Sequence, residues 1–326
     1  MKLGSLKNNK KLDGEPVVVS RDNKRAVKVG DIVPSIREAI ERWDEISPKL
    51  KRVYDDLNAS KIDNAFLVNE EDFHSPLPRS FQWADGSAFI EHVKLVRKAR
   101  NAAPPETLLT VPLMYQGGSD DFLAPTQDIP QIDFSHGTDF EGEVGVITSF
   151  VPMGTSAEEA LKHILLIVVI NDVSLRGLIP EELKSGFGFF HGKPATAFAP
   201  FAVTPDELGS AWKGGRVYLP LLVNYNGKFF GKANCSEMHF HFGQLISHAA
   251  KTRNLTAGTI IGSGTVSNED RSVGSSCLAE KRMIEKIETG EFKTPFMKVG
   301  ETVEIKMLSA IGENIFGTIH QKIVKA

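Results

Sequence analysis

Four acidic residues stand where a surface carboxylate is not the only sensible interpretation. Glu141 and Glu143 are two positions apart at the head of an apolar run, so in an extended chain their side chains leave the same face. Asp172 follows the apolar run 165–170, and Asp85 stands earlier in the chain. If the four converge, a hard divalent cation with oxygen ligands is the most direct way to neutralise them. The pattern predicts a site for Mg²⁺ or Ca²⁺, and Mn²⁺ would accept the same oxygens.

Each of these acids also has a plainer interpretation. Glu141 and Glu143 could line the solvated face of a strand, as in many one-sided sheets. Asp172 could cap the segment that follows its strand, and Asp85 could belong to a turn before a helix. Zn²⁺ is less expected than Mg²⁺ or Ca²⁺, because zinc sites usually offer His or Cys.

Two cations follow Asp172 in the chain. Arg176 and Lys193 could complete the charge balance of an acidic site while leaving a pocket that attracts an anionic oxygen. Taken singly, both are equally well read as solvated surface residues. Whether Arg176 and Lys193 lie close to the acids in space therefore distinguishes the two interpretations.

The elements that must position these residues are mostly short strands. The run 165–170 predicts a strand buried on both faces, and Asn226-Gly227 predicts a type I′ hairpin turn. The other predicted strands are 143–150, 217–224, 228–230, 259–261, 303–307 and 314–319. Strands outnumber helices without the regular βαβ alternation of a doubly wound sheet, which favours a β-rich α+β fold.

The first part of the chain is organised differently. Two short strands, 16–20 and 26–29, precede apolar residues that recur at helical spacing from Ile36 to Leu57, and Ser35 with Glu38 forms a capping box before them. This helical hairpin predicts a small N-terminal domain over residues 1–75. The polar, proline-containing stretch 69–79 serves as the linker, so the second domain covers 76–326. Two further helices are predicted, from Ser156 and over 242–251.

Composition excludes several classes of protein. The 326 residues carry 38 Lys plus Arg against 41 Asp plus Glu, a near balance that supplies no basic field for nucleic acid. The longest aliphatic run is far too short to cross a bilayer, so no membrane role is expected. Only Cys235 and Cys277 occur, too few for a disulfide framework, which favours the reducing cytoplasm.

In these surroundings the acids resemble those of the fumarylacetoacetate hydrolase family. Four stretches carry the resemblance: Asp85 with His92 seven residues later; 139–143; 168–174, continuing through Arg176 to Lys193; and 261–267. The resemblance implies a β-roll-like catalytic domain behind a small N-terminal domain, and a homodimer. It also implies a Mg²⁺ or Ca²⁺ ion bound by Asp85, Glu141, Glu143 and Asp172.

The resemblance further implies hydrolysis of a carbon–carbon bond in a small β-diketone acid. For fumarylacetoacetase itself the products are fumarate and acetoacetate, in the last step of tyrosine breakdown. His92 is similar to the general base that activates water, and Glu280 to the acid that orients it. Lys193 matches the cation that stabilises oxyanion charge. The residues that would contact the substrate are Tyr115, Arg176 and Thr265.

Three positions depart from the family pattern and leave the substrate open. Ile179 stands where a Gln is expected, Asn101 where an Arg is expected, and Ser87 where a Tyr is expected. The alternatives are acylpyruvate hydrolysis, oxaloacetate decarboxylation, keto/enol isomerisation, or a non-enzymatic binding protein stabilised by Ca²⁺. The pairing of His92 with Glu280 favours hydrolysis, because isomerases and decarboxylases can do without a water-activating pair.

Overall fold

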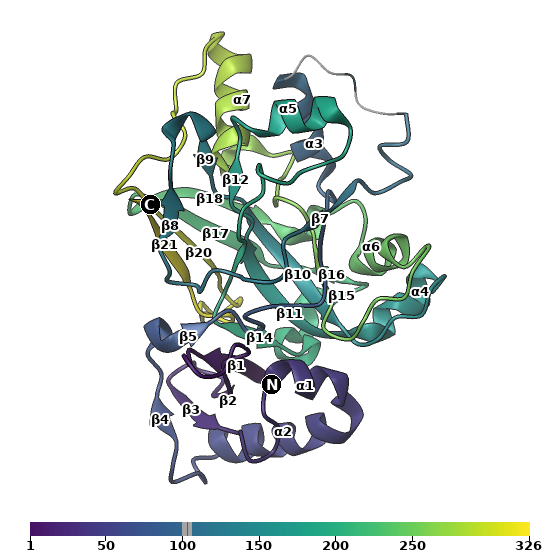
Figure 1. The fold of residues 1–326 in the computed structure, drawn as a ribbon, viewed down its shortest axis with the longest axis vertical. Helices are drawn as coiled ribbons and strands as arrows, with labels where there is room; N and C mark the ends of the chain where they lie inside the picture. Colours follow the sequence, from purple (N-terminus) through teal and green to yellow (C-terminus); the bar gives the residue numbers. More distant parts are fainter. Residues whose placement is uncertain (100–102, 104–105) are drawn as a thin grey trace.

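The fold is described by a computed structural model that covers residues 1–99, 103 and 106–326. Two sheets dominate it, one of twelve strands and one of five, and the helices lie around them (Figure 1). Both sheets mix short strands far apart in sequence. The predicted β-rich α+β class is confirmed.

The larger sheet combines strands from the N-terminal part of the chain with strands as late as β19. Its path is β4-β3-β2-β1-β14-β11-β10-β19-β6-β7, with β5 beside β1 and β13 beside β11. These strands are β1 (Lys2–Leu6), β2 (Glu15–Val19), β3 (Arg25–Lys28), β4 (Phe66–Leu67), β5 (Phe73–His74), β6 (Trp83–Gly86), β7 (Met114–Gly117), β10 (Gly142–Thr148), β11 (Ile164–Asn171), β13 (Ala197–Phe198), β14 (Phe201–Val203) and β19 (Ile260–Gly262).

The N-terminal part packs helices α1 (Ile36–Glu41) and α2 (Trp43–Asn58) against the first strands, at the lower end of the molecule in Figure 1. The Ser35 side chain accepts the Glu38 N–H, which confirms Ser35 as the N-cap of the predicted capping box; the reciprocal contact of the Glu38 side chain does not form among the described residues. β1 pairs with β14, which joins this part to the rest of the larger sheet. The boundary near residue 75 falls between β5 and β6 and stays a prediction.

The five-stranded sheet contains the predicted hairpin. Its order is β18-β17-β20-β21-β8, and Asn226 and Gly227, with φ of 50° and 71°, turn β17 into β18 as a type I′ turn requires. Its strands are β8 (Ile129–Gln131), β17 (Pro220–Tyr225), β18 (Lys228–Asn234), β20 (Thr302–Met307) and β21 (Ile319–Lys325). The predicted strand over 314–319 is wrong. That segment folds back on β20 through the bridge Leu308–Asn314, and the strand begins only at Ile319.

The remaining elements are short strand pairs and helices. The pairs are β9 (Thr138–Asp139) with β12 (Ser174–Leu175) and β15 (Trp212–Lys213) with β16 (Arg216–Val217). The helices are α3 (Ile90–Ala99), α4 (Ala157–Ala160), α5 (Ile179–Ser185), α6 (Phe242–Ala249) and α7 (Leu278–Thr289). Helices α3, α5 and α7 gather at the end of the molecule opposite the N-terminal strands (Figure 1).

The middle of the larger sheet is completely buried. Every residue of β10 and β11 is buried, because the two strands pair with each other and lie between layers of apolar side chains. β11 is thus buried on both faces, as its apolar run predicts. Among the residues that the structure describes, no helix combines the length and apolar composition that a membrane span requires.

Candidate metal-dependent active site

Three of the four predicted metal ligands converge at one edge of the larger sheet. Asp85 lies in β6, Glu143 in β10, and Asp172 directly after β11. Each offers one carboxylate oxygen, and these oxygens lie within 4.8 Å of one another. All three residues are buried, so neither a solvated strand face nor a surface turn describes them.

The environment of Glu143 fits a cation. Both of its carboxylate oxygens are buried, and neither has a hydrogen-bond partner among the described residues. Burial, reinforced by Asp85 and Asp172, raises the pKa of Glu143 well above its usual range, and burial with Asp172 does the same to the pKa of Asp85. Buried carboxylates are normally paired or bound to metal. Oxygen donors of this kind suit Mg²⁺, Ca²⁺ or Mn²⁺.

Glu141, the fourth predicted ligand, is joined to this group through Lys193. The Lys193 ammonium donates to Oε2 of Glu141 and, at 2.5 Å, to Oδ2 of Asp172. Burial alone would raise the pKa of Glu141, but Arg176 and Lys193 hold it well below its usual range. Lys193 is buried as well, and its pKa stays raised because the two carboxylates outweigh the effect of desolvation.

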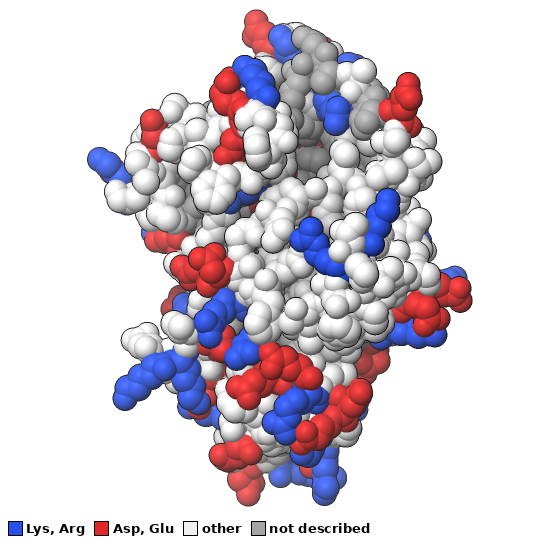
Figure 2. Space-filling view, turned by 45° about the vertical axis from the view of Figure 1, so that its right-hand side comes forward, with Lys and Arg blue, Asp and Glu red and all other residues white. Residues whose placement is uncertain are grey.

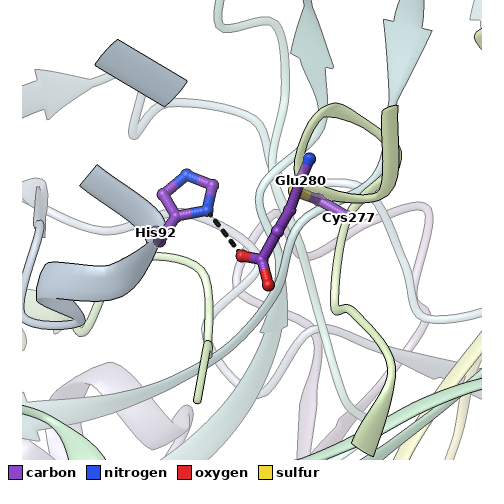
Figure 3. A group of neighbouring side chains, drawn as sticks. All are labelled: His92, Cys277 and Glu280. Carbon is purple, nitrogen blue, oxygen red and sulfur yellow. Dashed lines mark hydrogen bonds and ion pairs between the residues drawn. The ribbon is translucent and has the colours of Figure 1, made fainter. Parts of the chain in front are cut away.

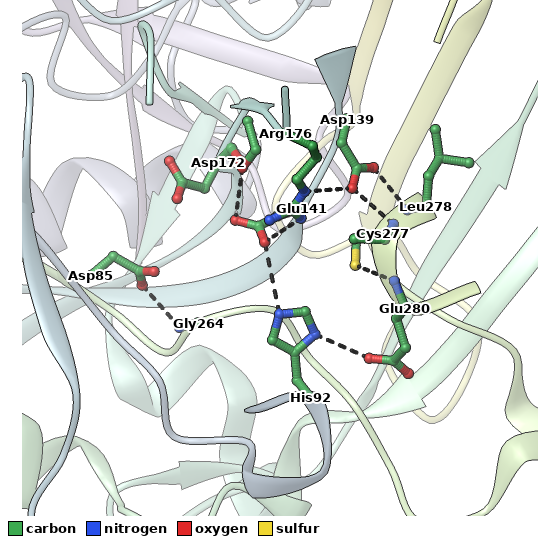
Figure 4. Close-up of polar contacts among 12 residues, drawn as sticks. Asp85, His92, Asp139, Glu141, Asp172, Arg176, Gly264, Cys277, Leu278 and Glu280 are labelled. Atoms are coloured by element: carbon green, nitrogen blue, oxygen red, sulfur yellow. Dashed lines mark hydrogen bonds and ion pairs between the residues drawn. The ribbon is translucent and has the colours of Figure 1, made fainter. Parts of the chain in front are cut away.

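Arg176 lies on the other side of Glu141. Its Nη2 donates to Oε1 of Glu141 at 2.6 Å, and its Nε donates to Oδ2 of Asp139 at 2.9 Å (Figure 4). The guanidinium thus contacts two buried carboxylates. Its predicted contact with substrate stays a prediction, whereas its contact with a predicted metal ligand is a feature of the fold.

His92 and Glu280 form a pair beside the acids. The His92 Nδ1 lies 3.2 Å from Oε2 of Glu280, with Cys277 next to them (Figure 3). The opposite ring atom, Nε2, is 3.9 Å from Oε1 of Glu141 (Figure 4). The imidazole therefore bridges the carboxylate of α7 and the acidic group. Glu280 is almost completely buried, which suits an acid that orients a histidine.

Two neutral side chains complete the surroundings of Asp172. Tyr115 donates from Oη to Oδ2 at 2.6 Å, and Thr196 donates from Oγ1 to Oδ1 at 2.8 Å. The Lys193 ammonium lies over the Tyr115 ring, 5.2 Å from the ring centroid. The Tyr115 and Phe189 rings pack together in a T-shaped arrangement. Tyr115 was expected near the substrate. Thr196 and Phe189 were not predicted from the sequence, and only the structure shows that they lie at the site.

Two glycines let the backbone approach Asp85. A Cβ on Gly262 would lie 2.3 Å from Oδ1 of Asp85 and 2.4 Å from the Trp83 ring. Gly264 has a φ of +75°, and its N–H donates to Oδ1 of Asp85 at 2.9 Å (Figure 4). Thr265, expected to contact substrate, follows directly and is buried.

Of the three residues that depart from the family pattern, the structure describes Ile179 and Ser87. Ile179 is buried in the first turn of α5, and the Ser87 N–H bonds to the Leu113 carbonyl. Asn101 lies outside the described residues. Asp139 was not expected as a functional residue, although its spacing of two from Glu141 repeats the spacing of two between Glu141 and Glu143.

Charge outside the site has no single sign on the face shown in Figure 2. Acidic and basic side chains are interspersed over the lower, N-terminal part, and much of the central face is uncharged. This distribution agrees with the near balance of 38 basic and 41 acidic residues.

Comparison with protein families accounts for both parts of the chain. Residues 1–79 match the family described as "Fumarylacetoacetase N-terminal domain 2". Residues 82–324 match "Fumarylacetoacetate (FAA) hydrolase C-terminal". The second match contains every residue of the site described above.

The curated relatives are distant and carry different names. The chain is 29% identical over 159 residues to 2,4-didehydro-3-deoxy-L-rhamnonate hydrolase of Sphingomonas sp. (strain SKA58), which covers 48% of this chain and 53% of that protein. It is 24% identical over 205 residues to oxaloacetate tautomerase YisK of Bacillus subtilis (strain 168), covering 62% and 64%. The chain thus spans between half and two thirds of the length of these relatives.

Solved structures share the fold over the whole chain. A fumarylacetoacetate hydrolase from Exiguobacterium antarcticum superposes with a TM-score of 0.69 at 16% identity, covering 100% of both chains. A maleylpyruvate hydrolase from Sphingobium sp. SYK-6 gives 0.67 at 13% identity, again covering 100% of both. At these identities the likeness shows the fold alone. Together with the family matches over 1–79 and 82–324, it leaves one conclusion: the chain belongs to the fumarylacetoacetate hydrolase family.

Proposed function

We propose that this protein is a divalent-metal-dependent hydrolase that cleaves a carbon–carbon bond in a small β-diketone acid, with 4-fumarylacetoacetate as the first substrate to test. The observation that carries the proposal is the His92–Glu280 pair beside the buried carboxylates of Asp85, Glu143 and Asp172. This combination offers a base that can activate water next to a cation site that can polarise a carbonyl of the diketone.

The residues that would hold the cation are Asp85, Glu143, Asp172 and, as the fourth, Glu141. A bound Mg²⁺ or Ca²⁺ ion would supply a Lewis acid that polarises the substrate carbonyl. Mn²⁺ fits the same donors. The oxygens of Glu143 support this role, since neither has a hydrogen-bond partner among the described residues.

His92 would move the proton of the attacking water. With a proton on Nδ1 held by Glu280, the Nε2 atom is left as the acceptor on the side of Glu141. Water would lose its proton to Nε2 as its oxygen adds to the carbonyl carbon. The carbon–carbon bond would then break, its electron pair leaving as an enolate that takes up a proton to give the ketone product.

Lys193 would stabilise the negative charge that develops on oxygen. Its ammonium is buried between Asp172 and Glu141, so it is held in place before the reaction begins. Tyr115, Arg176 and Thr265 are proposed to contact the substrate. A homodimer is proposed on the family resemblance, and light scattering on the purified protein tests it.

The experiment that tests the function follows the absorbance of fumarylacetoacetate with the purified protein and Mg²⁺. We expect the diketone absorbance to fall, the loss to stop with EDTA and return with added Mg²⁺, and His92→Ala to abolish it. The matched control is His191→Ala, because the His191 side chain is 76% exposed, and this variant should behave like the parent. A parent protein that leaves the absorbance unchanged with Mg²⁺, Ca²⁺ and Mn²⁺ contradicts the proposal.

A second candidate is tautomerisation of a small keto acid. The similarity to an oxaloacetate tautomerase favours it, because the same His92–Glu280 pair can move a proton at carbon instead of activating water. Oxaloacetate incubated with the protein distinguishes the two. Accelerated keto/enol exchange with no hydrolysis of any diketone acid selects the tautomerase.

A further inference from the structure

Asp139 is a buried carboxylate that contacts two separate parts of the site. It ends strand β9 and is completely buried. Its Oδ2 accepts from Nε of Arg176 at 2.9 Å and from the Ala279 N–H at 2.9 Å, while its Oδ1 accepts from the Leu278 N–H at 2.7 Å. Both oxygens are thus engaged, and by partners from different segments of the chain.

The first contact leads to the predicted metal ligand Glu141. Arg176 uses Nε for Asp139 and Nη2 for Oε1 of Glu141, so the position of one carboxylate sets that of the other through a rigid, planar group. The other oxygen of Glu141 accepts from Lys193 and from Ser174. Asp139 therefore helps to decide where the Glu141 carboxylate lies.

The second contact leads to Glu280. Leu278 and Ala279 are the first two residues of α7, where the backbone N–H groups have no partner within the helix. Asp139 accepts both N–H groups from a strand far away in sequence, and its negative charge suits a helix N-terminus. Because Glu280 is the next residue, the direction of this first turn determines where its carboxylate meets His92.

These contacts close a ring, most of which is visible in Figure 4. Asp139 contacts Arg176, Arg176 contacts Glu141, Glu141 lies 3.9 Å from His92, His92 contacts Glu280, and the first turn of α7 returns to Asp139. A displacement at Asp139 is therefore transmitted along both arms.

We propose that Asp139 is a positioning residue that aligns the metal ligand Glu141 with the catalytic pair of His92 and Glu280. The proposal rests on the proposed function, in which those groups act together. Asp139 itself touches no reacting atom. It acts through Arg176 on one side and through the N-terminus of α7 on the other.

The test is Asp139→Asn, which keeps the shape but replaces one acceptor oxygen with an NH₂ group that faces donors. We expect kcat and the affinity for Mg²⁺ each to fall about 10- to 100-fold, the range typical of groups that orient metal ligands. The matched control is Asp133→Asn. Asp133 is exposed and its side chain accepts the Ser135 N–H, a capping contact that Asn preserves. An Asp139→Asn protein with the parent kcat and Mg²⁺ affinity overturns the proposal.

Two further measurements separate positioning from general stability. The backbone amides of Leu278 and Ala279 donate to different oxygens of Asp139, and asparagine keeps only one of them. In Asp139→Asn at least one of the two amides should therefore exchange hydrogen faster, and in Asp133→Asn neither should. In a double-mutant cycle, Asp139→Asn should lower kcat by a smaller factor in Glu280→Gln than in the parent, since the part of its effect that passes through α7 is already lost. If the effects of Asp139→Asn and Glu280→Gln on kcat are fully additive in free energy, Asp139 does not act through the first turn of α7.

Mg²⁺ titration and amide exchange need no turnover, so they test the ring even if the protein hydrolyses no diketone acid. If Asp139→Asn does not fold, Arg176→Lys tests the other arm. A lysine ammonium is a compact point charge without the planar fork of the guanidinium, so it cannot hold the two carboxylates in the same fixed geometry. We expect weaker Mg²⁺ binding and a lower kcat. Parent values for both overturn the proposal.

Discussion

The Nδ1 atom of His92 lies 3.2 Å from Oε2 of Glu280, although 188 positions separate the two residues in the chain. Helix α3 carries the histidine and helix α7 carries the acid, and the two helices pack together. The contact leaves Nε2 directed toward the carboxylates. The proposed base is therefore oriented by a residue from a distant part of the chain.

Glu280→Gln tests this orientation. The amide can still bond to the imidazole but no longer supports the charge that the ring gains on taking a proton, so we expect kcat to fall about 100-fold. Affinity for Mg²⁺ should change little. Steady-state kinetics and Mg²⁺ titration provide the two measurements. Glu288→Gln, on the exposed side of the same helix, should behave like the parent.

Replacing the carboxylates tests the ligand set. Glu141→Gln and Asp172→Asn should each weaken Mg²⁺ binding strongly, since each removes an anionic oxygen from a buried group. Asp56→Asn, in helix α2 far from the site in sequence, serves as the control and should leave binding unchanged. Isothermal titration with Mg²⁺ gives the affinities. Three variants with the same affinity would refute the proposed ligands.

The binding of Mg²⁺ should become tighter as the pH rises. Burial raises the pKa values of Asp85 and Glu143 well above the usual carboxyl range, so both carboxyls keep their protons to a higher pH than free carboxyls do, and the cation must displace these protons. Without metal, the folded state holds protons at these two carboxyls that the unfolded chain releases, so their contribution to the free energy of unfolding should fall as the pH rises above about 4. Titrations in two buffers of different ionisation enthalpy count the released protons. Binding that is independent of pH, with no proton release, contradicts this prediction.

Gly262→Ala tests the close approach of β19 to Asp85. The added Cβ would lie 2.3 Å from Oδ1 of Asp85, so either the carboxylate or the strand must move. We expect a loss of about 1–3 kcal/mol in the free energy of unfolding, together with weaker Mg²⁺ binding. Gly30→Ala is the control, because a Cβ there meets no atom within 4 Å. Chemical denaturation of both variants decides the outcome, and equal stabilities would show that the site tolerates the methyl group.

The sequence by itself determined the local features. The apolar run of β11 predicts a strand buried on both faces, Asn226-Gly227 predicts a hairpin turn, and Ser35 predicts a helix start; the structure contains all three. These features depend on neighbours along the chain, through alternation, backbone conformation and capping. The four acids and Lys193 were also candidates for a charged site, because their chemistry belongs to the residues themselves, whereas the role of His92 was implied by the family resemblance.

Only the tertiary structure decided how these groups meet. Asp85 reaches Glu143 because β6 pairs with β19 and β19 pairs with β10, a register that no local pattern specifies. Other contacts between distant segments place Lys193 between Glu141 and Asp172 and join Asp139 to the start of α7. A local feature such as a turn or a helix cap depends on residues that are adjacent in the chain. The convergence of the site residues depends on packing energies summed over the whole chain. The strand wrongly expected over 314–319 has the same cause, since its backbone found partners outside a regular ladder.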